Sequence, residues 1–349
     1  MSTDSTLSSL GYSLPRRDTK TLFHLAGYFL YLVVTVALPR LVGWRQPVVP
    51  GWTIKQELVV AFIRYISLTE TTMVRKMNIH RDRQLRSSVR HAPVHGPGFH
   101  GVWVGSREDA FDATVLYLHG GGYTVGTAMD SAQLLTAIQS KAKLQQDKSI
   151  RMFSLEYSLA PEAKAKCFPS VAAFRFLAAE SSKPIVLMGA SAGGNLTLAL
   201  MLALKSTENQ DVRAPSAAVL FSPSCDLDLR VVWDSYATNS DSDYIGLEGK
   251  RLCANDYVGL ASPDDPLVSP LRGNFRGCCP SLIHYGGKEV LCDQIEALIL
   301  RLKDQGVDVA VAKEPLAPHV VVALDTVFPQ MAQACIRIAS DFTANAVNP

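Results

Sequence analysis

A serine stands among small residues in GASAGG at 189–194, between the apolar run 184–190 and the apolar run LTLALMLAL. This order predicts a strand, a sharp turn and a helix. Small neighbours permit a turn that lifts the hydroxyl of Ser191 above a sheet, and a helix N-terminus favours negative charge developing there. GxSxG alone is a common short motif, but in this setting it predicts a nucleophile.

A second motif, HGGGY at 119–123, directly follows another predicted strand. Glycines lack a Cβ atom, so their N–H groups can approach a substrate oxygen closely. We expect the N–H groups of Gly121, Gly122 and Ala192 to form an oxyanion hole. The alternatives are a glycine-rich turn without a ligand and a phosphate loop, although the GxGxxG and GKS/GKT patterns are absent.

These motifs resemble the hormone-sensitive-lipase-like branch of the α/β hydrolases over about residues 95–345. Further matches follow in the family's order: EYSLAPE at 156–162, SPSCDL at 222–227, DPLVSPL at 265–271, YGGKEVLCDQ at 285–294 and PHVV at 318–321. The EYSLAPE form and the apolar N-terminus are most similar to fungal steryl-acetyl-hydrolase-type esterases, some of which serve secondary metabolism. The resemblance implies a serine esterase or deacetylase in which His119 and Gly120 belong to the oxyanion motif.

A serine hydroxyl needs an adjacent base at neutral pH, and in this fold a histidine late in the chain supplies it. His319 follows the last predicted strand, whereas the other histidines lie in the apolar N-terminus, the glycine motif, a predicted strand or ahead of the catalytic loops. His319 is therefore predicted to be the base. A purely structural histidine is the alternative.

The triad acid is predicted to be Glu289, which stands where the family usually carries an aspartate. Asp293, four residues later, is the alternative acid, although a carboxylate early in a helix more often caps or pairs. Either carboxylate would orient the imidazole of His319 without taking its proton.

The elements that must position these residues alternate from about Phe99 onward. The predicted strands are 113–119, 149–157, 184–190, 217–222, 281–286 and 307–312, and the predicted helices are 131–145, 168–180, 191–205, 292–304 and 327–345. Continuous apolar strands separated by helices indicate a parallel sheet covered on both faces. The expected class is α/β, an α/β-hydrolase fold with a mostly parallel central sheet, flanking helices and a helical cap.

Residues 1–45 are predicted to be an N-terminal segment with an anchor-like helix, and 46–349 the hydrolase domain. Residues 22–38 carry no formal charge apart from what His24 acquires, and they approach the about 20 residues that span a bilayer. We expect a single membrane anchor, with the endoplasmic reticulum as a candidate location. The alternative is a cytoplasmic protein whose apolar helix packs over the active-site mouth.

Two segments are expected to form the cap, 46–95 and the insertion 224–265, which interrupts the alternation of strands and helices. Their apolar content favours a hydrophobic small-molecule substrate. The assignment of these segments to the cap rests on analogy with the fold and on no sequence motif.

The composition argues against other classes of partner. A formal charge of +2, without clustered Lys/Arg and interleaved aromatics, gives no reason to expect nucleic acid. The seven cysteines form neither CxxC pairs nor a Cys/His cluster, so no metal is expected, and the chemistry needs no organic cofactor.

Together these features predict a serine hydrolase that cleaves a carboxylic ester of a hydrophobic substrate through an acyl-enzyme. An intact triad would also serve biosynthetic acyl transfer, condensation or cyclisation. A non-hydrolytic ligand receptor on the same fold is a second alternative, but such receptors typically lack the histidine that His319 provides here.

Overall fold

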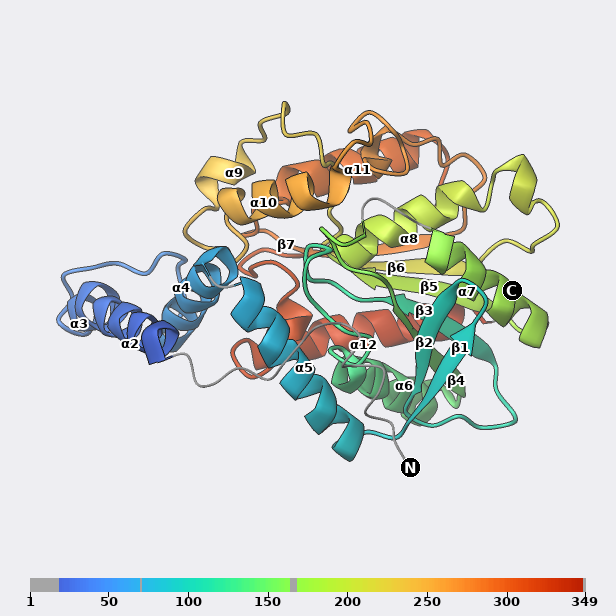
Figure 1. Cartoon of the computed structure of the whole chain (residues 1–349), viewed down its shortest axis with the longest axis horizontal. Coiled ribbons are helices and arrows are strands. Elements are labelled where there is room, and N and C mark those ends of the chain that lie inside the picture. The colour runs from blue at the N-terminus through green and yellow to red at the C-terminus, as the bar shows by residue number, and fades with distance from the viewer. Residues whose placement is uncertain (1–18, 70, 164–167, 348–349) are drawn as a thin grey trace.

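An eight-stranded sheet forms the centre of the computed structural model, which describes residues 19–69, 71–163 and 168–347 (Figure 1). The strand order is β1-β2-β4-β3-β5-β6-β7-β8. The strands are β1 (His91–Gly96), β2 (Phe99–Val104), β3 (Ala113–Leu118), β4 (Ile150–Glu156), β5 (Ile185–Ala190), β6 (Ala217–Phe221), β7 (Ser281–Gly286) and β8 (Val309–Glu314). β3 to β8 pair in parallel, whereas β1 and β2 form an antiparallel hairpin on β4. The predicted α/β-hydrolase fold is thus confirmed.

Side chains along each central strand alternate between two cores, one on each face of the sheet. In β3, Leu116 and Leu118 enter the first core, and Val115 and Tyr117 enter the second. The first face is covered by α7 (Phe168–Glu180), α8 (Ala192–Ala203) and α11 (Cys292–Asp304), and the second by α6 (Ala132–Gln146) and α12 (Pro329–Asn345) (Figure 1). Burial on both faces explains why these strands are apolar throughout.

The β1–β2 hairpin was not among the predicted strands. Every side chain of β1 remains at least partly accessible, and the strand contains Pro93 and two histidines. Proline lacks the N–H that a central strand needs and is tolerated at a sheet edge, where β1 lies. An edge strand of this composition has no apolar run for sequence analysis to detect.

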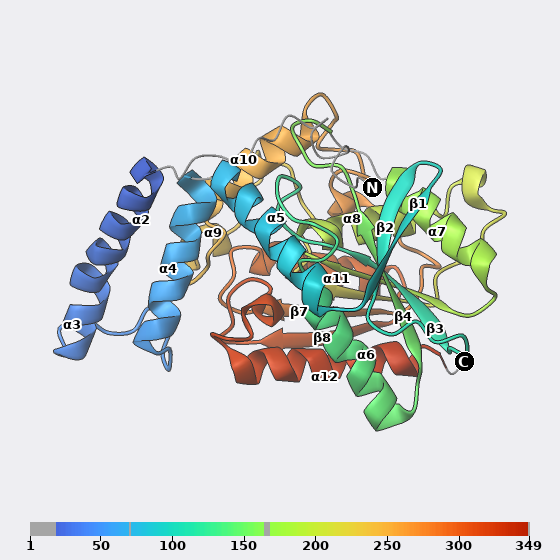
Figure 2. The same ribbon diagram turned by 60° about the horizontal axis from the view of Figure 1, so that its bottom comes forward.

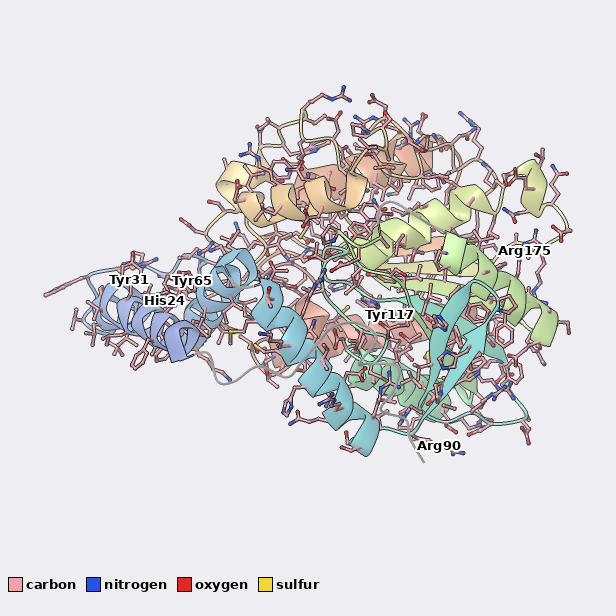
Figure 3. All side chains as sticks on the ribbon, viewed as in Figure 1. His24, Tyr31, Tyr65, Arg90, Tyr117 and Arg175 are labelled. Atoms are coloured by element: carbon pink, nitrogen blue, oxygen red, sulfur yellow. The ribbon has the colours of Figure 1, made fainter. Side chains whose placement is uncertain are left out.

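The N-terminal helices project from the body as a pair. A continuous helical rod made of α2 (Thr19–Leu32), the π-helical turn η1 (Val33–Ala37) and α3 (Leu38–Leu41) packs against α4 (Ile54–Thr69) (Figures 1 and 2). The rings of Tyr28 and Tyr65 stack at 3.8 Å, and Phe29 meets Phe62 edge-on at 6.1 Å. Figure 3 shows Tyr31 and Tyr65 on this projecting pair, away from Tyr117 in the sheet.

One helical stretch in the described residues, Phe23–Leu41, is long and apolar enough to cross a membrane by length and composition. It has 19 residues and a mean hydropathy of 1.4, and only 22% of its most apolar part is buried in the protein. Its exposed large side chains include Phe23, Leu30, Val34 and Leu41. The predicted apolar N-terminal helix is therefore present, and most of its surface is not covered by the protein.

The two segments expected to form the cap flank the carboxyl edge of the sheet. Residues 46–95 supply α4 and α5 (Thr71–Ser88), but their last residues form β1, so this part of the expected cap is wrong from residue 91 onward. The insertion 224–265 contains α9 (Ser235–Thr238) and α10 (Leu247–Val258). The short turns η2 (Thr207–Asn209), η3 (Pro270–Arg272) and η4 (Val321–Leu324) complete the helical elements that the structure describes.

Candidate active site

Ser191 occupies the sharp turn between β5 and α8. Its backbone has φ +54° and ψ −116°, a conformation that residues other than glycine rarely adopt. A Cβ atom at Gly193 would lie 2.0 Å from Leu118 O, and one at Gly189 would lie 2.3 Å from Gly193 O. Only glycine fits both places, because the turn packs directly on the backbone. Ala192 begins α8, so its N–H has no acceptor within the helix.

The glycine motif lies beside this turn, because β3 pairs with β5. Gly121 and Gly122 have φ values of +112° and +59°, which favour glycine. Space is equally restrictive: a Cβ atom at Gly121 would lie 2.1 Å from Val125 O, and one at Gly122 would lie 2.5 Å from Cys253 Sγ. The loop therefore brings bare backbone towards the serine.

His119 supports the glycine loop through its own contacts. Its Nδ1 donates to Gly120 O at 2.8 Å, and its ring stacks on Tyr157 at 4.0 Å. The hydroxyl of Tyr157 in turn donates to His119 O at 2.7 Å. Burial lowers the pKa of His119 to about 4, although the hydrogen bond to Gly120 opposes this shift. The imidazole is therefore neutral near pH 7.

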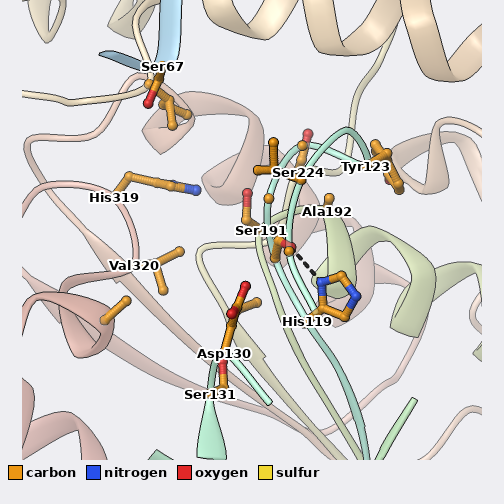
Figure 4. Close-up of a pocket in the computed structure, with 18 of the residues that line it drawn as sticks. Ser67, His119, Tyr123, Asp130, Ser131, Ser191, Ala192, Ser224, His319 and Val320 are labelled. Carbon is orange, nitrogen blue, oxygen red and sulfur yellow. Dashed lines mark hydrogen bonds between the residues drawn. The ribbon is translucent and has the colours of Figure 1, made fainter. Parts of the chain in front are cut away.

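Glu289 and His319 meet on the loops that follow β7 and β8. Glu289 Oε2 lies 2.5 Å from His319 Nδ1, with both side chains buried. Oε1 of Glu289 accepts the N–H of Gly286 at 2.8 Å. His319 Nε2 has no hydrogen-bond partner among the described residues, and Figure 4 shows the imidazole directed towards Ser191.

The surroundings of His319 also set its charge. Burial lowers its pKa, but the hydrogen bond to Glu289 and the charges of Glu289 and Asp243 raise it more, so that the pKa lies above its usual value. A raised pKa means a stronger base, which suits a group that must accept a hydroxyl proton.

Asp293, the alternative acid, is engaged elsewhere. It lies in the first turn of α11, where its Oδ2 accepts the N–H of Ser235 at 2.7 Å. The hydroxyl of Ser235 accepts the N–H of Asp293 at 3.3 Å. Asp293 thus joins α11 to α9, and the carboxylate beside His319 is that of Glu289.

Asp243 is the site residue that sequence reasoning missed. This fully buried residue of the insertion accepts the N–H of Val290 through Oδ2 at 2.7 Å and that of His319 through Oδ1 at 3.3 Å. Burial raises its pKa to about 6, although His319 opposes this shift. No motif distinguishes Asp243 from its exposed neighbour Asp241 in SDSDY, so the sequence carries no signal for it.

The donor set around His319 fits a hydrogen-bonded triad better than a metal cage. Ligand-type atoms of Asp243, Glu289 and His319 lie within 4.8 Å of one another. Glu289 and His319 bond directly to each other, however, and both oxygens of Asp243 accept backbone N–H groups. The atoms that would hold a cation already have partners.

A cavity of about 500 Å³ opens over Ser191 and His319. Figure 4 shows Ser191 at its centre, with Asp130 and Ser131 on the opposite side from Ser224 and Tyr123. The walls come from α4 and α5, from the β3–α6 connection and α6, from the insertion, and from η4 and α12. The apolar wall residues include Val74, Leu134, Ile245, Leu252, Val322 and Ile336. The cavity thus joins both expected cap segments to the serine.

Known proteins are similar to this chain in sequence and in fold. The profile of the alpha/beta hydrolase fold family matches residues 115–323. The chain is 31% identical to an acetyl-hydrolase of Streptomyces hygroscopicus across 69% of this chain and 78% of that one. It is 27% identical to an ethyl acetate hydrolase of Pseudomonas putida across 65% and 71% of the two chains.

A solved structure agrees with these sequence matches. The crystal structure of an esterase from the bacterial hormone-sensitive lipase family superimposes with a TM-score of 0.73 at 30% identity, covering 85% of this chain and all of that one. A crystal structure of the esterase EstE5 gives the same TM-score at 26% identity, covering 84% of this chain and 99% of that one. This protein therefore belongs to the hormone-sensitive-lipase-like esterases of the α/β-hydrolase family, and it is a carboxylic ester hydrolase.

Proposed function

We propose that this esterase uses Ser191 as its nucleophile, His319 as its general base and Glu289 as its triad acid. The buried contact between Glu289 and His319 carries this proposal, because it leaves Nε2 of His319 directed towards Ser191 and without a hydrogen-bond partner among the residues that the structure describes. The strained turn at Ser191 adds support, since strain of this kind is concentrated at functional sites.

Acylation begins when Ser191 Oγ attacks the ester carbonyl carbon while His319 Nε2 accepts the hydroxyl proton. The carbonyl oxygen gains negative charge, which the N–H groups of Gly121, Gly122 and Ala192 stabilise. The tetrahedral intermediate then collapses, and the carbon–oxygen bond to the alcohol breaks. His319 returns its proton to the alcohol oxygen, which leaves an acyl group on the serine.

Deacylation repeats these steps with water as the nucleophile. His319 accepts a proton from water, the hydroxide attacks the acyl carbon, and the same N–H groups bind the oxyanion. The bond to Ser191 Oγ breaks as His319 returns the proton to it, which releases the carboxylic acid. Glu289 keeps its negative charge throughout and stabilises the imidazolium.

The proposed substrate is a short-chain ester, above all an acetate, of a hydrophobic alcohol, such as a sterol ester or an acetylated secondary metabolite. Two relatives are an acetyl-hydrolase and an ethyl acetate hydrolase, which supports a short acyl group. The apolar cavity walls, from Val74 on α5 to Leu252 on α10, support a hydrophobic alcohol. The resemblance to fungal steryl-acetyl-hydrolase-type esterases agrees with both.

Replacing the nucleophile tests this function directly. We expect Ser191→Ala to lower kcat on a series of acetate, butyrate and longer acyl esters by a factor on the order of 10⁶, because no other group replaces the attacking oxygen. His319→Ala should cost as much, and the double variant no more, because the two act as a unit. Ser224→Ala, which removes another hydroxyl from the cavity lining, is the matched control and should stay active. Turnover near the wild-type rate in Ser191→Ala would refute the nucleophile.

A second pair of variants separates the two candidate acids. Glu289→Gln should lower kcat on the order of 10⁴-fold, because the amide mis-sets the tautomer or the orientation of His319. Asp293→Asn should keep most of the activity and lower the free energy of unfolding by about 1 kcal/mol, since it weakens one charge-assisted hydrogen bond to Ser235. Steady-state kinetics and thermal unfolding measure both effects. An inactive Asp293→Asn beside an active Glu289→Gln would reverse the assignment.

We further propose that Phe23–Leu41 anchors the protein to a membrane, with the endoplasmic reticulum as a candidate location. Large apolar side chains along this helix are exposed to solvent, at 62% for Leu30 and 53% for Val34. Apolar surface of this extent is typical of a face that contacts lipid or another protein. In the sequence, Arg16, Arg17 and Lys20 precede this apolar stretch, and basic residues that flank an apolar stretch are typical of membrane anchors.

Charged substitutions test the anchor in the full-length chain. The double variant Leu30→Asp/Val34→Asp should leave the membrane fraction, because an aspartate near the centre of an inserted helix costs about 2.5–3.5 kcal/mol. Leu144→Asp on α6, where the side chain is 85% exposed, is the matched control and should still sediment with membranes. Carbonate extraction followed by sedimentation makes the measurement. Equal solubility of wild type and the double variant would contradict the anchor.

A further inference from the structure

Side chains of the segment 239–243 of the insertion form hydrogen bonds with successive backbone groups of the loop that carries Glu289. Asn239 Nδ2 donates to Glu289 O at 2.9 Å, and Ser242 Oγ donates to Lys288 O at 3.0 Å. Asp243 Oδ2 accepts the N–H of the next residue, Val290, at 2.7 Å. Three successive backbone groups of this loop are therefore held by side chains from the cap.

Asp243 differs from Asn239 and Ser242 because it also forms a hydrogen bond with the loop that carries His319. Its Oδ1 accepts the N–H of His319 at 3.3 Å, so that one carboxylate binds the backbones on which both Glu289 and His319 stand. Two backbone hydrogen bonds, from Gly287 N to Glu314 O and from Lys288 N to Ala317 O, also join the two chain segments that follow β7 and β8.

A carboxylate in this place needs a physical reason, because burying a charge is costly unless its oxygens are hydrogen-bonded. Asp243 meets that condition with three N–H donors: Val290, His319 and its own neighbour Tyr244 at 2.7 Å. Arg64 of α4 holds the same segment from outside, since its guanidinium donates to Asp243 O at 3.3 Å and to Ser240 O. The cap thus places this carboxylate firmly.

We propose that Asp243 is a positioning residue for the reaction, which keeps Glu289 and His319 at the spacing that proton transfer requires. This inference rests on the triad proposed above. Asp243 touches neither Ser191 nor the cavity, so it acts through the two loops that it bridges. Its negative charge also lies close to the imidazolium that forms when His319 accepts a proton.

The negative charge of Asp243 and its hydrogen bonds to the two loops should affect different kinetic quantities. Losing the bridge loosens the spacing of Glu289 and His319, which lowers kcat by about 10- to 100-fold, as small misplacements of reacting groups do. The substrate contacts are unaffected, so KM should stay within about twofold. The charged and titratable groups that face the Asp243 carboxylate or its backbone are Glu289, His319, Tyr244 and Arg64.

The pH dependence follows from the sign of the charge effect. The negative charge of Asp243 raises the pKa of His319. Neutralising it therefore lowers that pKa, and the acid limb of the kcat/KM profile, which reports the free histidine, should move to lower pH. A residue that only stabilised the fold would not move this limb.

The experiment compares Asp243→Asn and Asp243→Ala with the wild type, using full-length protein and one soluble acetate ester. Asp243→Asn keeps the volume and one acceptor oxygen but presents an NH₂ group to one of the backbone donors. We expect both variants to show the lower kcat, the nearly unchanged KM and the shifted acid limb, with the alanine variant more affected. Circular dichroism checks the fold, and if Asp243→Ala unfolds, Asp243→Asn decides.

Two controls make the outcome unambiguous. Asp241→Asn changes an exposed carboxylate on the same segment, paired with Arg64 at 3.8 Å, and should behave as wild type. Ser191→Ala should be inactive in the same assay. Folded Asp243→Asn with wild-type kcat and an unmoved acid limb, beside inactive Ser191→Ala, overturns the role of Asp243 alone. Activity in Ser191→Ala overturns the proposed function on which that role depends.

Discussion

The hydrogen bond between Glu289 and His319 is the interaction around which the rest of this site is arranged. A carboxylate and an imidazole taken out of water lose hydration, and this loss is offset only if every remaining lone pair and proton finds a partner. Gly286 N–H satisfies the second oxygen of Glu289, and the loops after β7 and β8 hold the backbones. Within this pair of side chains, Nε2 of His319 has no hydrogen-bond partner in the described part of the chain, which leaves it free for the proposed reaction.

Close packing of the backbone determines the structure on the serine side of the site. The turn at Ser191 and the loop at Gly121 and Gly122 pack backbone against backbone, and side chains at their glycines would overlap neighbouring atoms. The positive φ of Ser191 costs free energy locally, which the buried parallel strands on either side of β5 offset. A rigid sheet thereby holds the strained Ser191, the proposed nucleophile, close to bare N–H groups, so that the proposed reaction needs little reorganisation.

How far the sequence predicts this structure depends on whether a feature has a local cause. The six parallel strands, the serine turn and the glycine loop were all predictable, because burial on two faces demands apolar runs in β3 to β7 and tight turns demand small residues, while the edge strand β8 still alternates Val and Ala. The β1 edge strand has no such requirement and was missed. The choice between Glu289 and Asp293 stayed open, since both stand in the same short run. The role of Asp243 could not be predicted, because its hydrogen-bond partners, Val290 and His319, are distant in sequence.

Covalent capture of the acyl group on the serine tests the central claim most directly. Full-length protein is mixed with p-nitrophenyl acetate, quenched in acid at short times and digested, and mass spectrometry locates any acetyl group. Our account predicts one acetyl group per chain on Ser191, formed as fast as the first turnover and lost when the reaction is allowed to run to completion. Turnover at the full rate with the acetyl group on another residue, or on none, would contradict it.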